Sequence, residues 1–176
     1  NNERICLVKA DPRQRGLFGA AWMLGYVASL APTGVEAITF GAPTGPLGMI
    51  YREAEHTQPF FDDLEAVAVY PVYHTMSALN RASGNPMVAT SCSQNDKVAC
   101  LAWREKEDTF VLIANLTADE QTIDLSGVPS GATLGVLDED SYIFATTNAK
   151  MFRRAGKLLG ESQIRLGGYA VAYLAY

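Results

Sequence analysis

Cysteine and histidine are scarce in this chain, which has three cysteines and two histidines among 176 residues. No pair of cysteines has the C-x-x-C spacing, and the odd number argues against a disulfide framework or a zinc site. We therefore expect no metal, no cofactor and reduced thiols in a cytoplasmic protein. A bridge between Cys92 and Cys100, which stand eight positions apart, remains an alternative.

Long apolar runs and basic patches are also missing. No apolar run approaches the ~20 residues that a membrane-spanning helix needs. The net charge is −5, which disfavours nucleic acid and anionic membranes as partners. The tightest group of cations is too short to form a binding patch, and we interpret it as a solvated face. It consists of Lys150, Arg153, Arg154 and Lys157.

The first clear element is a helix that is predicted to begin after Asp11 and to end before Pro32. Asp11 can accept hydrogen bonds from the free N–H groups of the first turn, and Pro12 at the first helical position loses no hydrogen bond. Apolar residues then recur at steps of three and four, which predicts one buried stripe. The stripe consists of Leu17, Phe18, Ala21, Leu24, Gly25, Ala28 and Leu30.

Residues 34–40, from Gly34 to Phe40, have the composition of a strand in a parallel sheet. Such a strand needs a neighbour on each side, and the sequence offers at most one upstream candidate, at residues 4–8. This arrangement is typical of the last strand–helix unit of a (β/α)₈ barrel. Because an open strand edge invites pairing with another chain, we also expect that a homo-oligomer could form through residues 34–40.

A long loop follows the predicted strand, and its first part alternates glycine and proline. Since prolines remove backbone N–H groups, this part is not a phosphate-binding loop. In a barrel the loop would lie on the catalytic face, at the C-terminal end of the last strand. Loops of this length are often functional, and the alternative is an ordinary surface loop with solvated charges. The candidates for substrate binding at this rim are Tyr51, Arg52, Glu53 and His56.

The pattern changes at Asn85 and Pro86, which end a second predicted helix that begins near Pro71. Before this point apolar residues follow the helical repeat, and after it they follow the two-residue repeat of strands. We therefore divide the chain into a helix–strand–helix unit at 1–86 and an antiparallel β-sandwich at 87–176. His74, in the first turn of the second helix, is expected to make a structural hydrogen bond.

Apolar runs and turn residues locate the strands of the second part. A charged turn at 105–108 separates two nearly continuous apolar runs, which we expect to be central antiparallel neighbours. Asn115 belongs to an Asn-Leu-Thr sequon, which we interpret as the end of a strand. Residues 141–160 fit either helix or strand. The predicted strands are 98–103, 110–114, 121–125, 133–137 and 169–174.

Several of these segments resemble the C-terminal part of D-apionate lactonase and its relatives. The resemblance implies an α+β chain, with the end of a glycoside-hydrolase-like (β/α)₈ barrel followed by a β-sandwich. It also implies hydrolysis of a sugar lactone, or of a glycosidic bond in the wider group. The matching segments are DPRQ at 11–14, LFGAAWMLG at 17–25, residues 34–48, YPVYH at 70–74 and VLIANLT at 111–117.

No residue of the chain can be assigned a catalytic role. A retaining glycosidase needs two carboxylates about 5–5.5 Å apart, and the end of the predicted barrel strand, at residues 38–41, carries none. We therefore favour a non-catalytic C-terminal unit of a longer hydrolase whose substrate is a small sugar derivative. The alternative is a stand-alone β-sandwich module that binds carbohydrate or protein, which the unpaired barrel-type strand disfavours.

Overall fold

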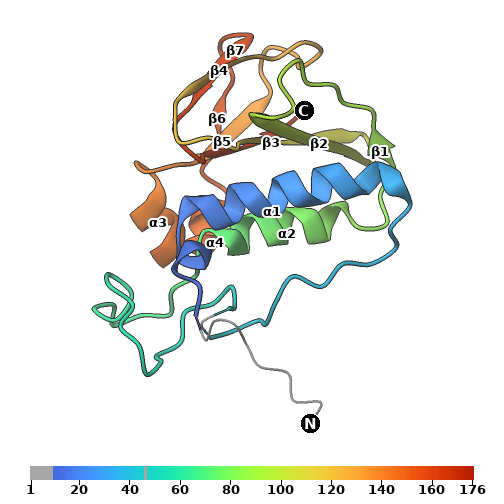
Figure 1. Ribbon diagram of the computed structural model, residues 1–176. Coiled ribbons are helices and arrows are strands. Elements are labelled where there is room, and N and C mark those ends of the chain that lie inside the picture. The colour runs from blue at the N-terminus through green and yellow to red at the C-terminus, as the bar shows by residue number, and fades with distance from the viewer. Residues whose placement is uncertain (1–9, 46) are drawn as a thin grey trace.

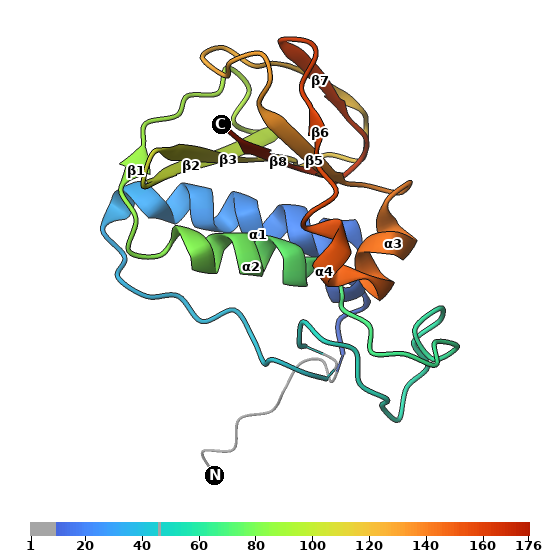
Figure 2. The ribbon, with the colours of Figure 1, turned by 180° about the vertical axis from the view of Figure 1, so that it is seen from behind.

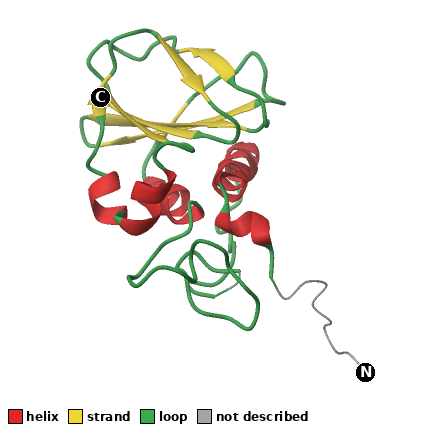
Figure 3. Ribbon diagram, turned by 90° about the vertical axis from the view of Figure 1, so that its left-hand side faces the viewer, coloured by secondary structure: helices red, strands yellow, loops and turns green. Residues whose placement is uncertain are grey.

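The computed structural model describes residues 10–45 and 47–176, and these residues form three layers (Figures 1 and 3). Two antiparallel sheets make up the first layer, helices cover one face of the larger sheet, and a long loop lies on the far side of the helices. The chain is therefore α+β, as the sequence predicts.

The larger sheet has six strands in the order β1-β2-β3-β8-β5-β6, and the smaller sheet pairs β4 with β7. Every pairing within these sheets is antiparallel. The strands are β1 (Met87–Val88), β2 (Val98–Glu105), β3 (Asp108–Asn115), β4 (Gln121–Asp124), β5 (Thr133–Leu137), β6 (Lys157–Leu158), β7 (Gln163–Leu166) and β8 (Val171–Ala175).

The two long apolar runs are antiparallel neighbours, which confirms the prediction made from the charged turn. β2 and β3 pair from Val98 opposite Asn115 to Glu105 opposite Asp108. Lys106 closes the turn with a φ of 57°. β3 also pairs with β8 on its other edge, and both of its faces are buried, because Ile113 packs in one hydrophobic core and Leu112 in another.

A hydrophobic core fills the space between the two sheets. Leu125, Ile164 and Leu166 come from the β4–β7 side and are at most 7 % exposed. They pack against residues of the larger sheet that include Ile113 and Leu174. β4 alternates half-buried and exposed residues, as expected for a strand with one face in water.

The helices are α1 (Leu17–Leu30), α2 (Val72–Ala82), α3 (Tyr142–Thr147) and α4 (Ala149–Phe152), with 3-10 turns at Pro12–Arg15 and Ala31–Thr33. α1 and α2 lie side by side under the larger sheet (Figures 1 and 2). None of the helices in the described residues is both long and apolar enough to cross a membrane.

The first helix begins later than predicted, and its buried surface is wider. The Asp11 carboxylate accepts from the Arg13 backbone N–H at 3.0 Å, so Asp11 is a cap as predicted, but it caps the 3-10 turn Pro12–Arg15, whereas α1 begins after Gly16. Ala21 and Leu24 pack toward the sheet, as expected for the predicted stripe. Met23 is also buried, against the core of the long loop. The helix therefore buries two faces because it lies between two layers.

The strand predicted at 34–40 is not formed, and this prediction is wrong for the chain as it folds here. Gly34 takes a left-handed turn with a φ of 79°, and residues 35–40 belong to no strand formed among the described residues. Val35 and Ile38 are 48 % and 37 % exposed. A strand exists only when a neighbour completes its hydrogen bonds, and the upstream candidate at 4–8 lies outside the described residues.

The ambiguous stretch at 141–160 is mostly helical. α3 and α4 follow each other directly and are joined at Asn148, whose side chain donates to the Thr147 hydroxyl at 3.0 Å. The short strand β6 then extends the larger sheet. The helical layer thus contains residues from both ends of the chain.

Candidate functional site

The long loop between Phe40 and α2 is held in a defined shape by its own backbone. The N–H groups of Met49 and Ile50 donate to the Pro43 carbonyl at 3.1 and 3.0 Å. The chain passes so close at Gly48 that a Cβ there would lie 2.4 Å from the Thr44 carbonyl carbon. Only glycine fits at this crossing, which accounts for one of the glycines in the Gly–Pro run.

Four side chains form a connected hydrogen-bond network inside this loop. The Tyr51 hydroxyl donates to Asp62 Oδ1 at 3.0 Å, and the Gln58 backbone N–H donates to the other oxygen of the same carboxylate. The Gln58 side-chain amide donates to the Arg52 carbonyl at 2.9 Å. The Tyr70 hydroxyl donates to Gln58 Oε1. We call Tyr51, Gln58, Asp62 and Tyr70 the loop network.

Aromatic rings surround the loop network and shield part of it from water. Phe61 is 2 % exposed, stacks on the Tyr51 ring with centroids 5.8 Å apart, and meets the Tyr70 ring edge-on at 4.8 Å. Phe60 bridges to Tyr142 of α3, 5.7 Å between centroids. The loop therefore has a small core of its own, which fixes the backbone of residues 51–62.

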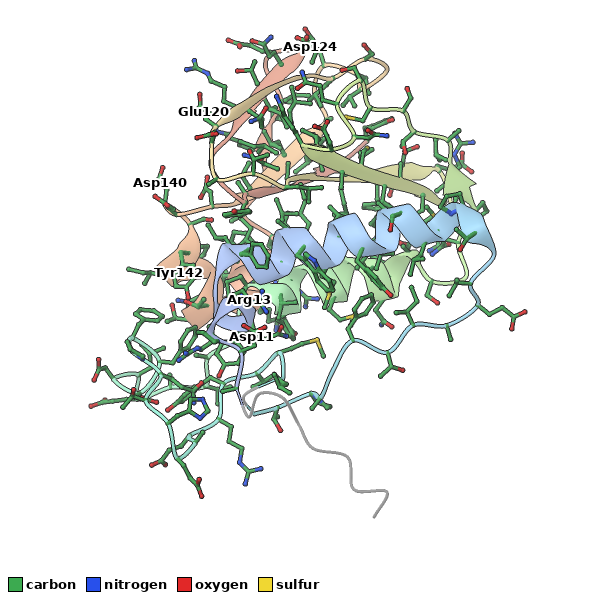
Figure 4. All side chains as sticks on the ribbon, viewed as in Figure 1. Asp11, Arg13, Glu120, Asp124, Asp140 and Tyr142 are labelled. Carbon is green, nitrogen blue, oxygen red and sulfur yellow. The ribbon has the colours of Figure 1, made fainter. Side chains whose placement is uncertain are left out.

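Tyr142 ties this loop core to the start of the helical layer. Its hydroxyl donates to the Arg15 carbonyl at 2.8 Å, and the Arg15 guanidinium donates to the Thr57 carbonyl at 3.3 Å. Figure 4 labels Tyr142 at the same end of the helices as Asp11 and Arg13. The loop is thus anchored on two helical segments that are far apart in the sequence.

The tyrosines of this region remain protonated at neutral pH. Burial raises the pKa of Tyr70 to about 12. Burial also raises the pKa of Tyr51, with a further contribution from its hydrogen bond to Asp62. Because both hydroxyls keep their protons, both act as donors in the loop network. The network therefore keeps its hydrogen bonds over the whole physiological pH range.

The structure brings together only part of the predicted rim. Tyr51 belongs to the loop network. Arg52 and Glu53 are exposed and His56 is half-buried. In the part of the chain that the structure describes, the side chains of these last three residues make no hydrogen bond and no ion pair. The segment that carries them is held at both ends, because the Arg52 carbonyl accepts from Gln58 and the Thr57 carbonyl accepts from Arg15.

Gln58, Asp62 and Tyr70 belong to the loop network but not to the predicted rim, and Gln58 connects the other two. It is fully buried and joins the Arg52 carbonyl, Asp62 and Tyr70. An isolated glutamine in a loop has no spacing that predicts burial. The one available signal is the Phe60-Phe61 pair close behind it, which shows that this loop has apolar residues to bury.

Carboxylates elsewhere in the described residues do not form a catalytic pair. Figure 4 shows Glu120, Asp124 and Asp140 spread along one side of the molecule rather than gathered at one point. Within residues 10–45 and 47–176, no group of three or more His, Cys, Asp or Glu side chains could hold a metal ion.

Comparison with protein families identifies the two parts of the chain. Residues 1–84 match the D-apionate lactonase TIM barrel domain, and residues 95–174 match the D-apionate lactonase C-terminal immunoglobulin-like domain. The chain belongs to the D-apionate lactonase-like proteins. A curated D-apionate lactonase from Brucella anthropi is 29 % identical over 126 residues, which are 72 % of this chain and 19 % of that protein. The chain thus spans about a fifth of its relative's length.

Solved structures show the same fold at low sequence identity. A conserved exported protein from Bacteroides fragilis superposes with a TM-score of 0.60 at 12 % identity, over 100 % of this chain and 37 % of that protein. A GH30 endoxylanase from Clostridium papyrosolvens gives a TM-score of 0.54 at 11 % identity, over 92 % and 39 %. The chain therefore shares its fold with a part of each of these two proteins.

Proposed function

We propose that this chain is the C-terminal unit of a sugar-lactone hydrolase, that it helps to close the barrel, and that its long loop contributes to the substrate-binding rim. In such a reaction water adds to the lactone carbonyl carbon and the ring C–O bond breaks, which yields a carboxylate, a hydroxyl and one proton. The groups that catalyse this step would lie on barrel strands outside these 176 residues.

The observation that supports the binding role is the loop network. Buried Gln58 fixes the backbone on which Arg52 and Glu53 stand, so the binding groups lose little freedom when a ligand arrives. A guanidinium suits a lactone carbonyl or a product carboxylate, and a carboxylate suits sugar hydroxyls. His56 can donate or accept at the same rim.

The packing also favours a barrel unit over a stand-alone β-sandwich module. Ala21 and Leu24 of α1 share one hydrophobic cluster with Leu101 and Leu112 of the sheet. A separate binding module would not need helices in its core. The free thiols of Cys92 and Cys100 are compatible with the cytoplasmic location that we propose.

Titration with D-apionate, the acid that lactone opening would yield, tests the rim by two-dimensional amide NMR. We expect shifts at the amides of residues 51–56. Arg52→Gln should weaken binding about tenfold, because a hydrogen bond to a charged group contributes about 1.5–3 kcal/mol. Arg104→Gln, on the exposed face of β2, is the matched control and should leave the affinity unchanged. If the chemical-shift changes are confined to other residues, the loop is not part of the binding site.

Proton release on addition of a sugar lactone tests the non-catalytic role. The chain alone should open the lactone no faster than buffer does. Turnover that is lost in Glu53→Gln or Asp63→Asn would contradict this role and would place the chemistry in the long loop.

A further inference from the structure

A cavity lies between the helical layer and the larger sheet, away from the long loop. It has a volume of about 740 Å³ and is enclosed by α2, α4 and the strands β3, β5 and β8. Figure 2 shows α4 beside α2 under β5. Cavities of roughly 300–1,000 Å³ are typical of small-molecule sites, so the space suits a compact organic ligand.

The inner wall of this cavity is apolar and aromatic. Trp103 and Phe110 stack with centroids 5.4 Å apart, and Trp103 is only 2 % exposed. Phe152 of α4 and Tyr173 of β8 line the same space, with rings 6.5 Å apart at nearly right angles. The Arg81 guanidinium lies over the Phe110 ring, 4.0 Å from its centroid, and Trp103 stacks on the same ring. Phe152 and Tyr173 are therefore the rings that can contact the flat body of a ligand.

The rim of the cavity carries positive charge. Arg81, Lys150, Arg153 and Arg154 line it, and no acidic side chain of the described residues does. Arg81 is paired with Glu105 at 2.5 Å, and Arg153 donates to the Ser77 hydroxyl at 2.7 Å. Among the residues that the structure describes, Lys150 and Arg154 have no ion-pair partner, so two cations are available to an anionic group.

Two residues that line the cavity each hold a buried ring nitrogen without a hydrogen-bond partner within the described residues: Nδ1 of His74 and Nε1 of Trp103. The His74 Nε2 lies 2.9 Å from the Ala145 carbonyl, so this nitrogen is the donor. Burial lowers the pKa of His74, which leaves Nδ1 as a neutral acceptor. The indole Nε1 is a donor. A hydroxyl group that reaches either atom can satisfy it, because a hydroxyl both donates and accepts.

We propose that this cavity binds a small organic anion with a ring body, a carboxylate and a hydroxyl group. The carboxylate lies between Lys150 and Arg154, the ring lies against Phe152 and Tyr173, and the hydroxyl points toward the wall that holds His74. The cluster at 150–154 is then one side of a binding site rather than a solvated face. Binding here requires no lactone hydrolysis and no contact with the long loop.

Calorimetric titration of the 176-residue chain with 4-hydroxycinnamate tests the proposal. This probe has a ring, a carboxylate and a hydroxyl, and we expect saturable binding with a Kd of about 1 mM or tighter. Its uncharged methyl ester and acetate, which lacks the ring, should each bind at least tenfold more weakly. Amide shifts should fall on α4 and on Tyr173, which separates this site from the loop at 51–56.

A charge-matched pair of double variants locates the anion. Lys150→Gln with Arg154→Gln should weaken binding about tenfold or more. Lys157→Gln with Arg165→Gln removes the same charge from exposed positions outside the cavity and should bind as the unmodified chain does. Equal loss in both double variants, equal affinity for the ester, or no binding of 4-hydroxycinnamate would overturn the proposal.

Discussion

Removal of one hydroxyl group, by Tyr70→Phe, should destabilise the long loop measurably. Tyr70 and Gln58 are both fully buried, and the Tyr70 hydroxyl is the partner of Gln58 Oε1. The substitution keeps the ring and its contact with Phe61, so it creates almost no cavity. It leaves a buried acceptor without a donor.

The expected cost follows from the burial of that acceptor. An unsatisfied buried polar atom costs about 1–3 kcal/mol, whereas loss of an exposed hydrogen bond costs much less. Replacement of both partners by apolar groups, in Tyr70→Phe with Gln58→Leu, should therefore be less damaging than the sum of the single changes, with a coupling of about 1 kcal/mol. Tyr26→Phe, on an exposed ring whose hydroxyl makes no hydrogen bond among the described residues, is the matched control.

Urea unfolding and amide hydrogen exchange give the two readouts. The Tyr51 N–H donates to the Ala68 carbonyl at 3.0 Å and reports on the loop. It should exchange faster in Tyr70→Phe but not in Tyr26→Phe. The pKa of Tyr70 is raised to about 12. The protonated hydroxyl therefore stabilises the fold fully below about pH 10, and this stabilisation declines as the pH rises toward 12. If the free energies of unfolding of Tyr70→Phe and Tyr26→Phe agree within ~0.5 kcal/mol, the loop network does not stabilise the loop.

Three further outcomes are expected. Asn115→Asp should lower the free energy of unfolding by about 3–5 kcal/mol, measured in thermal or urea melts. The buried Asn115 amide donates to the carbonyls of Asp119, Leu166 and Gly167, and a carboxylate cannot. Wild-type stability of this variant at neutral pH would contradict that reading. Burial raises the pKa of Cys100 to about 11, so its thiol should react slowly with disulfide reagents at pH 8. The contribution of the protonated thiol to stability should fall between pH 9 and 11. Rapid labelling of the folded chain would show that the thiol is accessible. Association through residues 34–40 should appear as a concentration-dependent mass in light scattering, and Ile38→Lys should abolish it. A chain that is monomeric at every concentration would show that residues 34–40 are not an interface.

The β part could be predicted in some detail because its signals are local. The apolar runs that became β2 and β3 are separated by a charged turn, and the structure pairs them as expected. The sequon residue Asn115 ends β3, as predicted, and its buried side chain explains why a strand must end there. The short strands β1, β6 and β7 were missed. β1 and β6 have two residues each, which are too few to show a period.

The loop and the unpaired segment could not be predicted for a different reason. Whether residues 34–40 form a strand depends on a neighbour, not on their own propensity. Burial of Gln58 depends on a tyrosine twelve positions away and on the aromatic rings around it. Tyr51 could be named as a candidate from its place on the predicted rim, but the backbone that positions it is held by contacts that no short-range pattern encodes.

The position of α1 explains why a β-sandwich would be fused to a barrel's last unit. Met23 packs in the loop core, whereas its neighbour Leu24 packs against the sheet. Consecutive residues of a helix point about 100° apart, so one rigid cylinder contacts both cores. Because close-packed side chains transmit displacements rather than absorb them, a shift of the sheet moves the helix and with it the support of Tyr51. We therefore expect substitutions in the sheet face that packs on α1 to alter the protection of the Tyr51 amide in the loop.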